Sequence, residues 1–149
     1  MSLISVDEIV KSYGKVPAVD RLSLRVEEGS IMGLIGPSGA GKTTTIKIIS
    51  GLLKPDRGSV RVLNEEPWDN PALKSRIGTI HERACFPYRH TILAYLQRAC
   101  RIFGKPEARG REVLALTKLE DAHDRTIKTL PAGMLKKLAM AHACINEPD

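Results

Sequence analysis

The sequence predicts an α/β fold, and three observations lead to that class. Residues 36–43 read Gly-Pro-Ser-Gly-Ala-Gly-Lys-Thr, which matches the phosphate-binding loop pattern Gly-x-x-x-x-Gly-Lys-Ser/Thr. A nearly continuous apolar run at 30–35 precedes this loop, as expected for a parallel strand that is covered on both faces. Alternating apolar residues before the run predict further strands, and helical spacing after residue 91 predicts helices.

The first part of the chain is typical of a strand, a turn and a second strand. Apolar and polar residues alternate at 4–6 and again at 22–26. A turn at 13–15, with glycine at its centre, should separate the two strands. A second turn at 28–29 leads into the apolar run, which we expect to be a buried strand.

The loop that follows carries a specific chemistry. Glycines at its first, fourth and sixth positions let backbone N–H groups surround a phosphate without steric conflict. Lys42 would place an ammonium beside the β- and γ-phosphates, and Thr43 would offer a hydroxyl to Mg²⁺. The helix that begins here points its positive end at the same phosphates. The alternative is a glycine-rich turn without a ligand. The predicted phosphate-loop residues are Gly36, Pro37, Ser38, Gly39, Ala40, Gly41, Lys42, Thr43 and Thr44.

The elements expected after the loop follow from spacing and turn residues. Ile46, Ile49 and Leu53 lie at helical spacing, and Gly51 should end the regular helix. The next elements are a turn at 55–58, a half-buried strand at 60–63, a left-handed Asn64, a short helix at 71–76 and a buried strand at 77–80. Three helices should follow. The first spans 91–103, the second runs from Pro106 to Leu119, and the third begins after Gly133. The faces expected to be buried comprise Ile92, Tyr95, Leu96 and Ala99, then Val113, Leu116 and Leu119, then Leu135, Leu138, His142 and Ile145.

Composition is that of an ordinary globular domain, with 42% hydrophobic and 27% charged residues in a chain of 149. The net charge of +6 permits an anionic lipid or nucleic-acid partner without requiring one, and we do not expect nucleic acid. Three widely spaced cysteines, Cys85, Cys100 and Cys144, predict reduced thiols in a cytosolic protein. We expect no signal peptide, because charge interrupts the first apolar residues, and no stretch approaches the roughly 18 apolar residues of a membrane span.

With these motifs the chain resembles the nucleotide-binding domain of ABC transporters over all 149 residues. The resemblance implies a P-loop nucleoside triphosphatase core with a helical insert, incomplete at the C-terminus. The expected division is a strand-rich core at 1–82 and a helical insert at 83–149. In the family, a strand with a Mg²⁺-binding aspartate and a catalytic glutamate would follow Asp149, and a histidine lies later still. We therefore assign no catalytic residue.

The resemblance also implies roles outside the phosphate loop. Tyr13 matches an aromatic residue that stacks on adenine; the alternative is a surface turn tyrosine. Glu82 stands where the family has a glutamine that contacts Mg²⁺ and the membrane partner; the alternative is an exposed loop glutamate. The family also has a signature loop, Leu-Ser-Gly-Gly-Gln, which binds the γ-phosphate of ATP held by a second subunit. The resemblance implies a degenerate form of this loop, which comprises Leu130, Pro131, Ala132, Gly133 and Met134.

The function that the resemblance implies is ATP binding, with Mg²⁺, as the energy-coupling ATPase subunit of a membrane transporter. Residues 43–47 and 50–55 look most like exporter-type subunits. The partners would be a transmembrane permease subunit and a second nucleotide-binding domain, identical or not. Such a protein would be cytoplasmic, at the inner face of the cell membrane. Two alternatives remain open, a non-hydrolysing or regulatory nucleotide-binding module and a soluble ABC-type protein that acts on nucleic acid or ribosomes.

Overall fold

The structure is a computed structural model that describes residues 2–80 and 85–149. The chain divides into two compact units, Met1–Lys74 and Ser75–Asp149. The boundary expected between residues 82 and 83 lies outside the described residues and stays a prediction. Glu82 also lies outside them. No helix within the described ranges is long and apolar enough to cross a bilayer.

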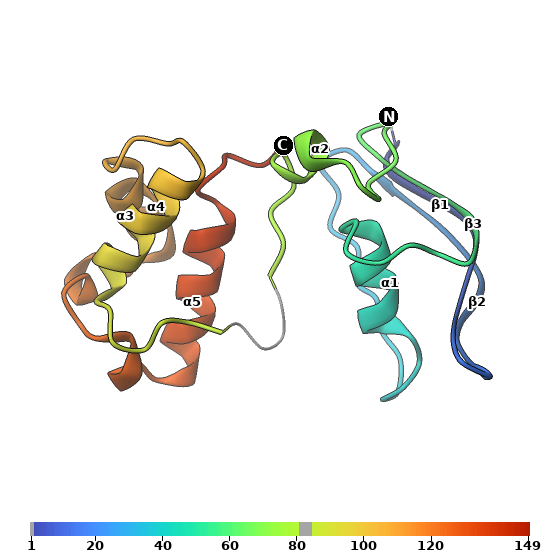
Figure 1. Cartoon of the computed structure of the whole chain (residues 1–149), viewed down its shortest axis with the longest axis horizontal. Coiled ribbons are helices and arrows are strands. Elements are labelled where there is room, and N and C mark those ends of the chain that lie inside the picture. Colours follow the sequence, from blue (N-terminus) through green and yellow to red (C-terminus); the bar gives the residue numbers. More distant parts are fainter. Residues whose placement is uncertain (1, 81–84) are drawn as a thin grey trace. The chain divides into compact units, whose positions relative to one another are not determined.

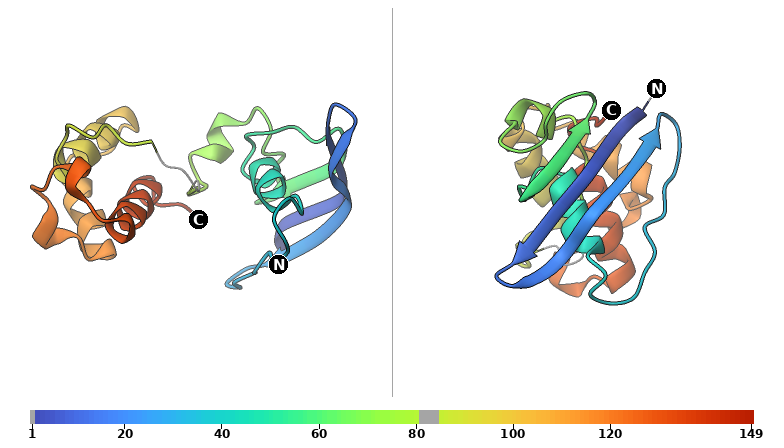
Figure 2. Two further views of the ribbon diagram at one scale, coloured as in Figure 1. Left: turned by 90° about the horizontal axis from the view of Figure 1, so that it is seen from below. Right: turned by 90° about the vertical axis from the view of Figure 1, so that its right-hand side faces the viewer.

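The first unit is a three-stranded antiparallel sheet covered by one helix. Strands β1 (Ser2–Tyr13) and β2 (Val16–Glu27) form the predicted hairpin, and β3 (Arg57–Val62) pairs with the other edge of β1, so that the order is β2-β1-β3. The inward residues of the alternating pattern are buried, as at Val6 and Val60, which face each other across β1 and β3. Helix α1 (Lys42–Ile49) lies along one face of this sheet (Figure 1, Figure 2).

Two predicted strands are not formed. Residues 30–35 carry no strand pairing, and the side chains of Ile31 and Ile35 are 101% and 95% exposed. Residues 77–80 likewise belong to no strand. A parallel strand satisfies its backbone groups only through a neighbouring strand, and the described residues supply none beside either run. The prediction of two buried strands is therefore wrong for the described structure, because an apolar run forms a strand only where a neighbouring strand pairs with it.

The second unit is helical. Helices α3 (Ile92–Ile102), α4 (Arg109–Thr117) and α5 (Ala132–Ala143) pack around a common core, with single 3₁₀ turns η1 (Glu120–Ala122) and η2 (Ile127–Thr129) between the last two. The short helix α2 (Pro71–Lys74) belongs to the first unit. Core side chains with little or no exposure include Ile92, Leu96, Cys100, Val113, Leu114, Leu119, Ile127, Leu138, Ala141 and Ile145.

The predicted helical faces are confirmed at most positions, and Leu116 is the exception. Its side chain is 67% exposed, whereas Leu114 is buried. The helix ends at Thr117, and the left-handed Lys118, with φ of 55°, redirects the chain so that Leu119 reaches the core. The spacing therefore predicted the helix correctly but extended it past its end.

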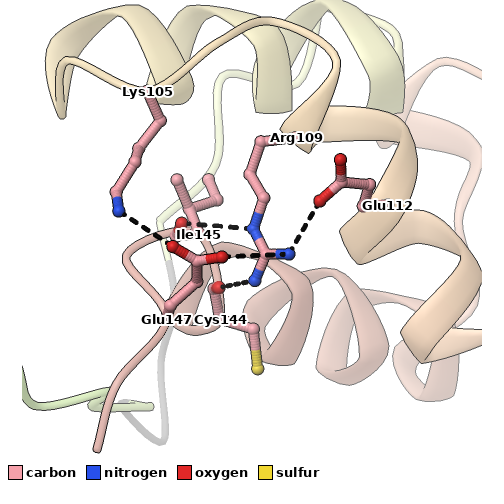
Figure 3. Close-up of polar contacts among 6 residues, drawn as sticks. All are labelled: Lys105, Arg109, Glu112, Cys144, Ile145 and Glu147. Atoms are coloured by element: carbon pink, nitrogen blue, oxygen red, sulfur yellow. Dashed lines mark hydrogen bonds and ion pairs between the residues drawn. The ribbon is translucent and has the colours of Figure 1, made fainter.

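The C-terminal end of α5 is held by one arginine. Arg109 donates from Nη2 to the carbonyl of Cys144 at 2.9 Å and from Nε to that of Ile145 at 3.4 Å (Figure 3). Its Nη1 also donates to Glu112 at 2.9 Å. The last carbonyls of a helix have no partner within it, so the guanidinium satisfies groups that would otherwise need water.

Candidate nucleotide-binding site

The loop at 36–43 has the backbone that its glycines predict. Gly39 and Gly41 have φ of 82° and 83°, in the left-handed region, and the preceding residues 31–40 are all exposed. Helix α1 begins directly after Gly41, and its first turn contains no acidic residue. The positive end of the helix is therefore not neutralised from within and faces the loop.

Gly41 is required for space as well as for conformation. A Cβ atom built on it would lie 2.1 Å from the carbonyl oxygen of Ala18 and 3.2 Å from Cγ2 of Val19. Both neighbours belong to β2. The end of the loop thus lies directly against the hairpin, and this close approach holds the start of α1 in place.

Lys42 directs its ammonium back into the loop. Its Nζ donates to the carbonyl oxygens of Gly36 at 2.7 Å and Pro37 at 2.6 Å. These two carbonyls are the first two of the motif, so the charge lies beside the segment that would surround a phosphate. This agrees with the role expected for the lysine of a phosphate-binding loop.

The three threonines after Lys42 differ in burial. Thr43 is exposed, so its hydroxyl can reach a metal ion, and Thr44 is half-buried. Thr45 is 2% exposed, and its hydroxyl donates to the carbonyl of Gly41 at 3.0 Å. Sequence reasoning missed this role of Thr45. A threonine four residues after the last glycine, where its hydroxyl can bond the preceding turn, was the available signal.

Tyr13 lies at the end of the hairpin near the same part of β2. It pairs with Val16, while Lys11, two residues earlier in β1, pairs with Val19, the residue against which Gly41 packs. Two residues of a strand span about 7 Å. The ring is 53% exposed, and the hairpin turn and the phosphate loop lie at the same end of the unit (Figure 1). An exposed ring at this place suits the predicted stacking on a base.

The five residues of the degenerate signature loop lie at the start of α5, in the second unit. Leu130 is buried, Pro131 is the N-cap, and Ala132 is the first helical residue. No side chain caps this helix, its first turn holds no acid, and a Cβ on Gly133 would meet nothing within 4 Å. Met134 packs partly against the helical core. The loop therefore has the helix-start geometry that was expected, and its ligand stays a prediction.

The metal predictions rest on Thr43 and Glu82, and only Thr43 is described. Among the described residues, no group of three His, Cys, Asp or Glu side chains could hold a metal ion by itself. Mg²⁺ commonly binds through substrate phosphates and only one or two protein oxygens. The exposed hydroxyl of Thr43 fits that kind of site, with the nucleotide supplying most of the ligands.

A glycine loop at the start of a helix, with a basic residue facing it, defines a P-loop nucleotide-binding protein of the α/β class. The family model described as ABC transporter matches residues 19–149. The chain therefore belongs to the ABC transporter family, as an ATP-binding domain.

Named relatives and solved structures agree with this assignment. The chain is 34% identical to the Nod factor export ATP-binding protein I of Ralstonia nicotianae, over 99% of this chain and 47% of that protein. It is also 34% identical to the spermidine/putrescine import ATP-binding protein PotA of Legionella pneumophila, over 99% of this chain and 42% of that protein. The chain thus spans about half the length of the curated relatives that it matches.

Among solved structures, a nucleotide-free ATP-binding cassette from an ABC transporter matches with a TM-score of 0.83 at 25% identity. An ATP-binding cassette in its ADP conformation matches with the same TM-score and identity. Each comparison covers 99% of this chain and 66% of the other. The predicted fold class, a P-loop nucleoside triphosphatase core with a helical part, is confirmed.

Proposed function

We propose that this chain binds ATP with Mg²⁺ as the nucleotide-binding part of an ABC transporter subunit. The observation that carries the proposal is the position of the Lys42 ammonium, 2.7 Å from the carbonyl of Gly36 at the start of the loop. From there it can reach a triphosphate held by the loop backbone and the start of α1. Thr43 would hold the metal, and Tyr13 would stack on the base.

The partners that we propose are a transmembrane permease subunit and a second nucleotide-binding domain, identical or different, at the inner face of the cell membrane. The relatives named above support a transporter, since their names describe ATP-binding proteins of export or import systems. We propose export as the direction, on the similarity to the Nod factor export proteins, although an import protein is equally similar. Transport measured in vesicles that contain the permease would decide the direction.

A second candidate is nucleotide binding without turnover, and Pro131 favours it. Proline at the N-cap of α5 offers neither a hydroxyl nor an N–H to a phosphate. The family's serine would offer both. A module that binds ATP without closing on it could act as a regulatory or supporting subunit. Phosphate release by the purified chain, abolished by Lys42→Ala, would exclude this candidate.

The test of the main proposal is a titration with Mg-ATP. Charge-assisted contacts contribute roughly 1.5–3 kcal/mol, so Lys42→Ala should weaken binding by about tenfold or more. The matched control is Lys47→Ala, which removes an exposed lysine from the last turn of the same helix. This control should bind like the parent chain. Equal affinities in all three proteins would contradict the proposal.

A further inference from the structure

The last residues of β1 have a strand on one side only. The pairing of β1 with β3 ends at Val10 opposite Arg57, whereas the pairing with β2 continues to Tyr13 opposite Val16. The pairing with β2 is itself irregular here, with register shifts on both sides of Lys11. Ser12 lies opposite Pro17, which has no N–H to donate. The segment that carries Tyr13 is therefore weakly held by strand pairing alone.

Asp56 supplies the missing neighbour. It directly precedes β3, and its backbone N–H donates to the carbonyl of Val10 at 2.8 Å. Its side chain then contacts β1 beyond Val10, where β3 no longer pairs with it. Oδ2 accepts from the backbone N–H of Ser12 at 2.8 Å, and Oδ1 accepts from Nζ of Lys11 at 2.7 Å. A carboxylate thus takes the place that a strand carbonyl would occupy, beyond the last paired residue.

The electrostatics of this contact favour the ionised carboxylate. The hydrogen bond from Lys11, followed by that from the Ser12 amide, holds the pKa of the Asp56 carboxyl below its ordinary value. The Lys11 side chain is largely buried, so its ammonium stays close to this partner. Hydrogen bonds to an ionised acceptor are stronger than those between neutral groups.

Tyr13 depends on its backbone because little else fixes its ring. No ring contact involves Tyr13 among the residues that the structure describes, and the side chain is mostly in solvent. The direction of an exposed side chain follows from its backbone and its rotamer preferences. Whatever holds Ser12 in place therefore also sets the direction from which Tyr13 leaves the strand.

We propose that Asp56 is a positioning residue for base recognition, whose carboxylate holds the Ser12 amide and thereby places the Tyr13 ring where a base can stack on it. The inference rests on the proposed function, because it assigns a support to the base site of the same nucleotide. It also connects two parts of that site, since Asp56 ends the segment that leads from α1 to β3.

The experiment compares Mg-ATP with inorganic tripolyphosphate as ligands of the purified chain. Asp56→Ala should weaken ATP binding by roughly threefold to tenfold, the range expected for one net hydrogen bond, and leave tripolyphosphate binding unchanged. Asp56→Asn keeps an acceptor oxygen for Ser12 and should retain more ATP affinity than Asp56→Ala. Combined with Tyr13→Ala, the Asp56→Ala change should cause no further loss.

Asp20→Ala is the matched control, because it removes an exposed carboxylate from the hairpin that Asp56 contacts and changes the net charge equally. A second measurement, amide hydrogen exchange, reports the backbone directly. The Ser12 amide should exchange faster in Asp56→Ala than in the parent chain, with Asp56→Asn in between.

Three results would overturn the inference. These are equal losses of ATP and tripolyphosphate in Asp56→Ala, unchanged exchange at Ser12, and full ATP affinity in Tyr13→Ala. Full ATP affinity in Tyr13→Ala would still leave triphosphate binding by the loop standing, provided that Lys42→Ala weakens binding as expected. Loss of neither ligand in Lys42→Ala would instead contradict the proposed function itself.

Discussion

The guanidinium of Arg109 reaches the carbonyl of Cys144 at 2.9 Å, so a side chain at the start of α4 closes the last turn of α5 (Figure 3). The two residues are separated by 35 positions in the sequence. The same guanidinium lies 3.8 Å from Glu147, which also pairs with Lys105 at 3.1 Å. Because only 16% of its side chain is exposed, Arg109 is shielded from the solvent that weakens surface pairs.

Replacing Arg109 should therefore destabilise the helical unit. Arg109→Ala should lower its free energy of unfolding by about 2 kcal/mol, because charge-assisted hydrogen bonds to two partly buried carbonyls are lost. Arg109→Lys should recover only part, since an ammonium cannot reproduce the fork of donors. Denaturant unfolding measures the change. Arg101→Ala, which removes an exposed arginine paired with Glu107 at 3.4 Å, is the control and should change stability by about 0.5 kcal/mol or less.

His142 should make stability depend on pH. Desolvation holds its pKa below the ordinary value of 6.5, in a site where it stacks on Tyr95 and bonds the Tyr95 hydroxyl through Nδ1 at 2.9 Å. As pH falls below about 6.5, His142 becomes protonated in the unfolded chain while it stays neutral in the folded chain, so the free energy of unfolding decreases. Above that pH, the contribution of neutral His142 to the free energy of unfolding is fully present. Below the folded pKa it changes no further.

The measurement is denaturant unfolding at several pH values between 7.5 and 5. His142→Gln, which can still bond the Tyr95 hydroxyl, should remove this part of the pH dependence. An unchanged slope in the variant would assign the effect to other groups.

The two left-handed glycines of the phosphate loop should respond differently to alanine. Gly41→Ala places a Cβ 2.1 Å from the Ala18 oxygen, so the loop must move away from β2, and Mg-ATP affinity should fall at least tenfold. Gly39 has a similar φ, but a Cβ on it meets nothing within 4 Å. Gly39→Ala should therefore cost only the roughly 1–2 kcal/mol of free energy by which a side chain disfavours left-handed backbone. Titration of both variants separates close packing from conformation. Equal effects would show that packing against β2 does not matter.

Pro131→Ser should strengthen both the helix and the assembly that we propose. A serine N-cap can accept a hydrogen bond from the first turn of α5 and typically stabilises a helix by about 0.5–2 kcal/mol. Its hydroxyl could also contact the phosphate of a nucleotide on a second subunit. ATP-dependent self-association, followed by sedimentation, should increase relative to Pro131→Ala. No gain would favour a heterodimer or no dimer.

The apolar run before the phosphate loop should bind hydrophobic dyes. Ile31 and Ile35 are almost fully in solvent, and an unpaired apolar segment is a site of aggregation. The double change Ile31→Lys with Ile35→Lys should reduce dye fluorescence. Val16→Lys, which removes an exposed valine outside this run, is the control and should not reduce the fluorescence. A chain that melts cooperatively at high temperature and binds no dye would contradict this prediction.

Elements that depend on residues close in the sequence were predictable, whereas contacts between residues far apart in the sequence were not. Helices at Ile92–Ile102 and Ala132–Ala143 were predictable, because each has a local apolar period. The runs at 30–35 and 77–80 were predicted as strands and are not, because pairing depends on neighbours that no local pattern contains. The contact of Asp56 with Ser12 joins residues 44 positions apart, and the turn at 55–58 gave no indication of it.

The carbonyls that bind Lys42 also determine how a nucleotide can be recognised. Its ammonium has three N–H donors, and two of them already have partners within the loop. A triphosphate that takes more than the one remaining donor would have to displace these bonds. The affinity that Lys42 contributes is therefore a difference between two sets of contacts. Because partly exposed side chains change rotamer within nanoseconds, this exchange should reduce equilibrium affinity without slowing association. The loop carbonyls would thus compete with a phosphate for the same ammonium, and a weakly charged ligand should gain least from Lys42.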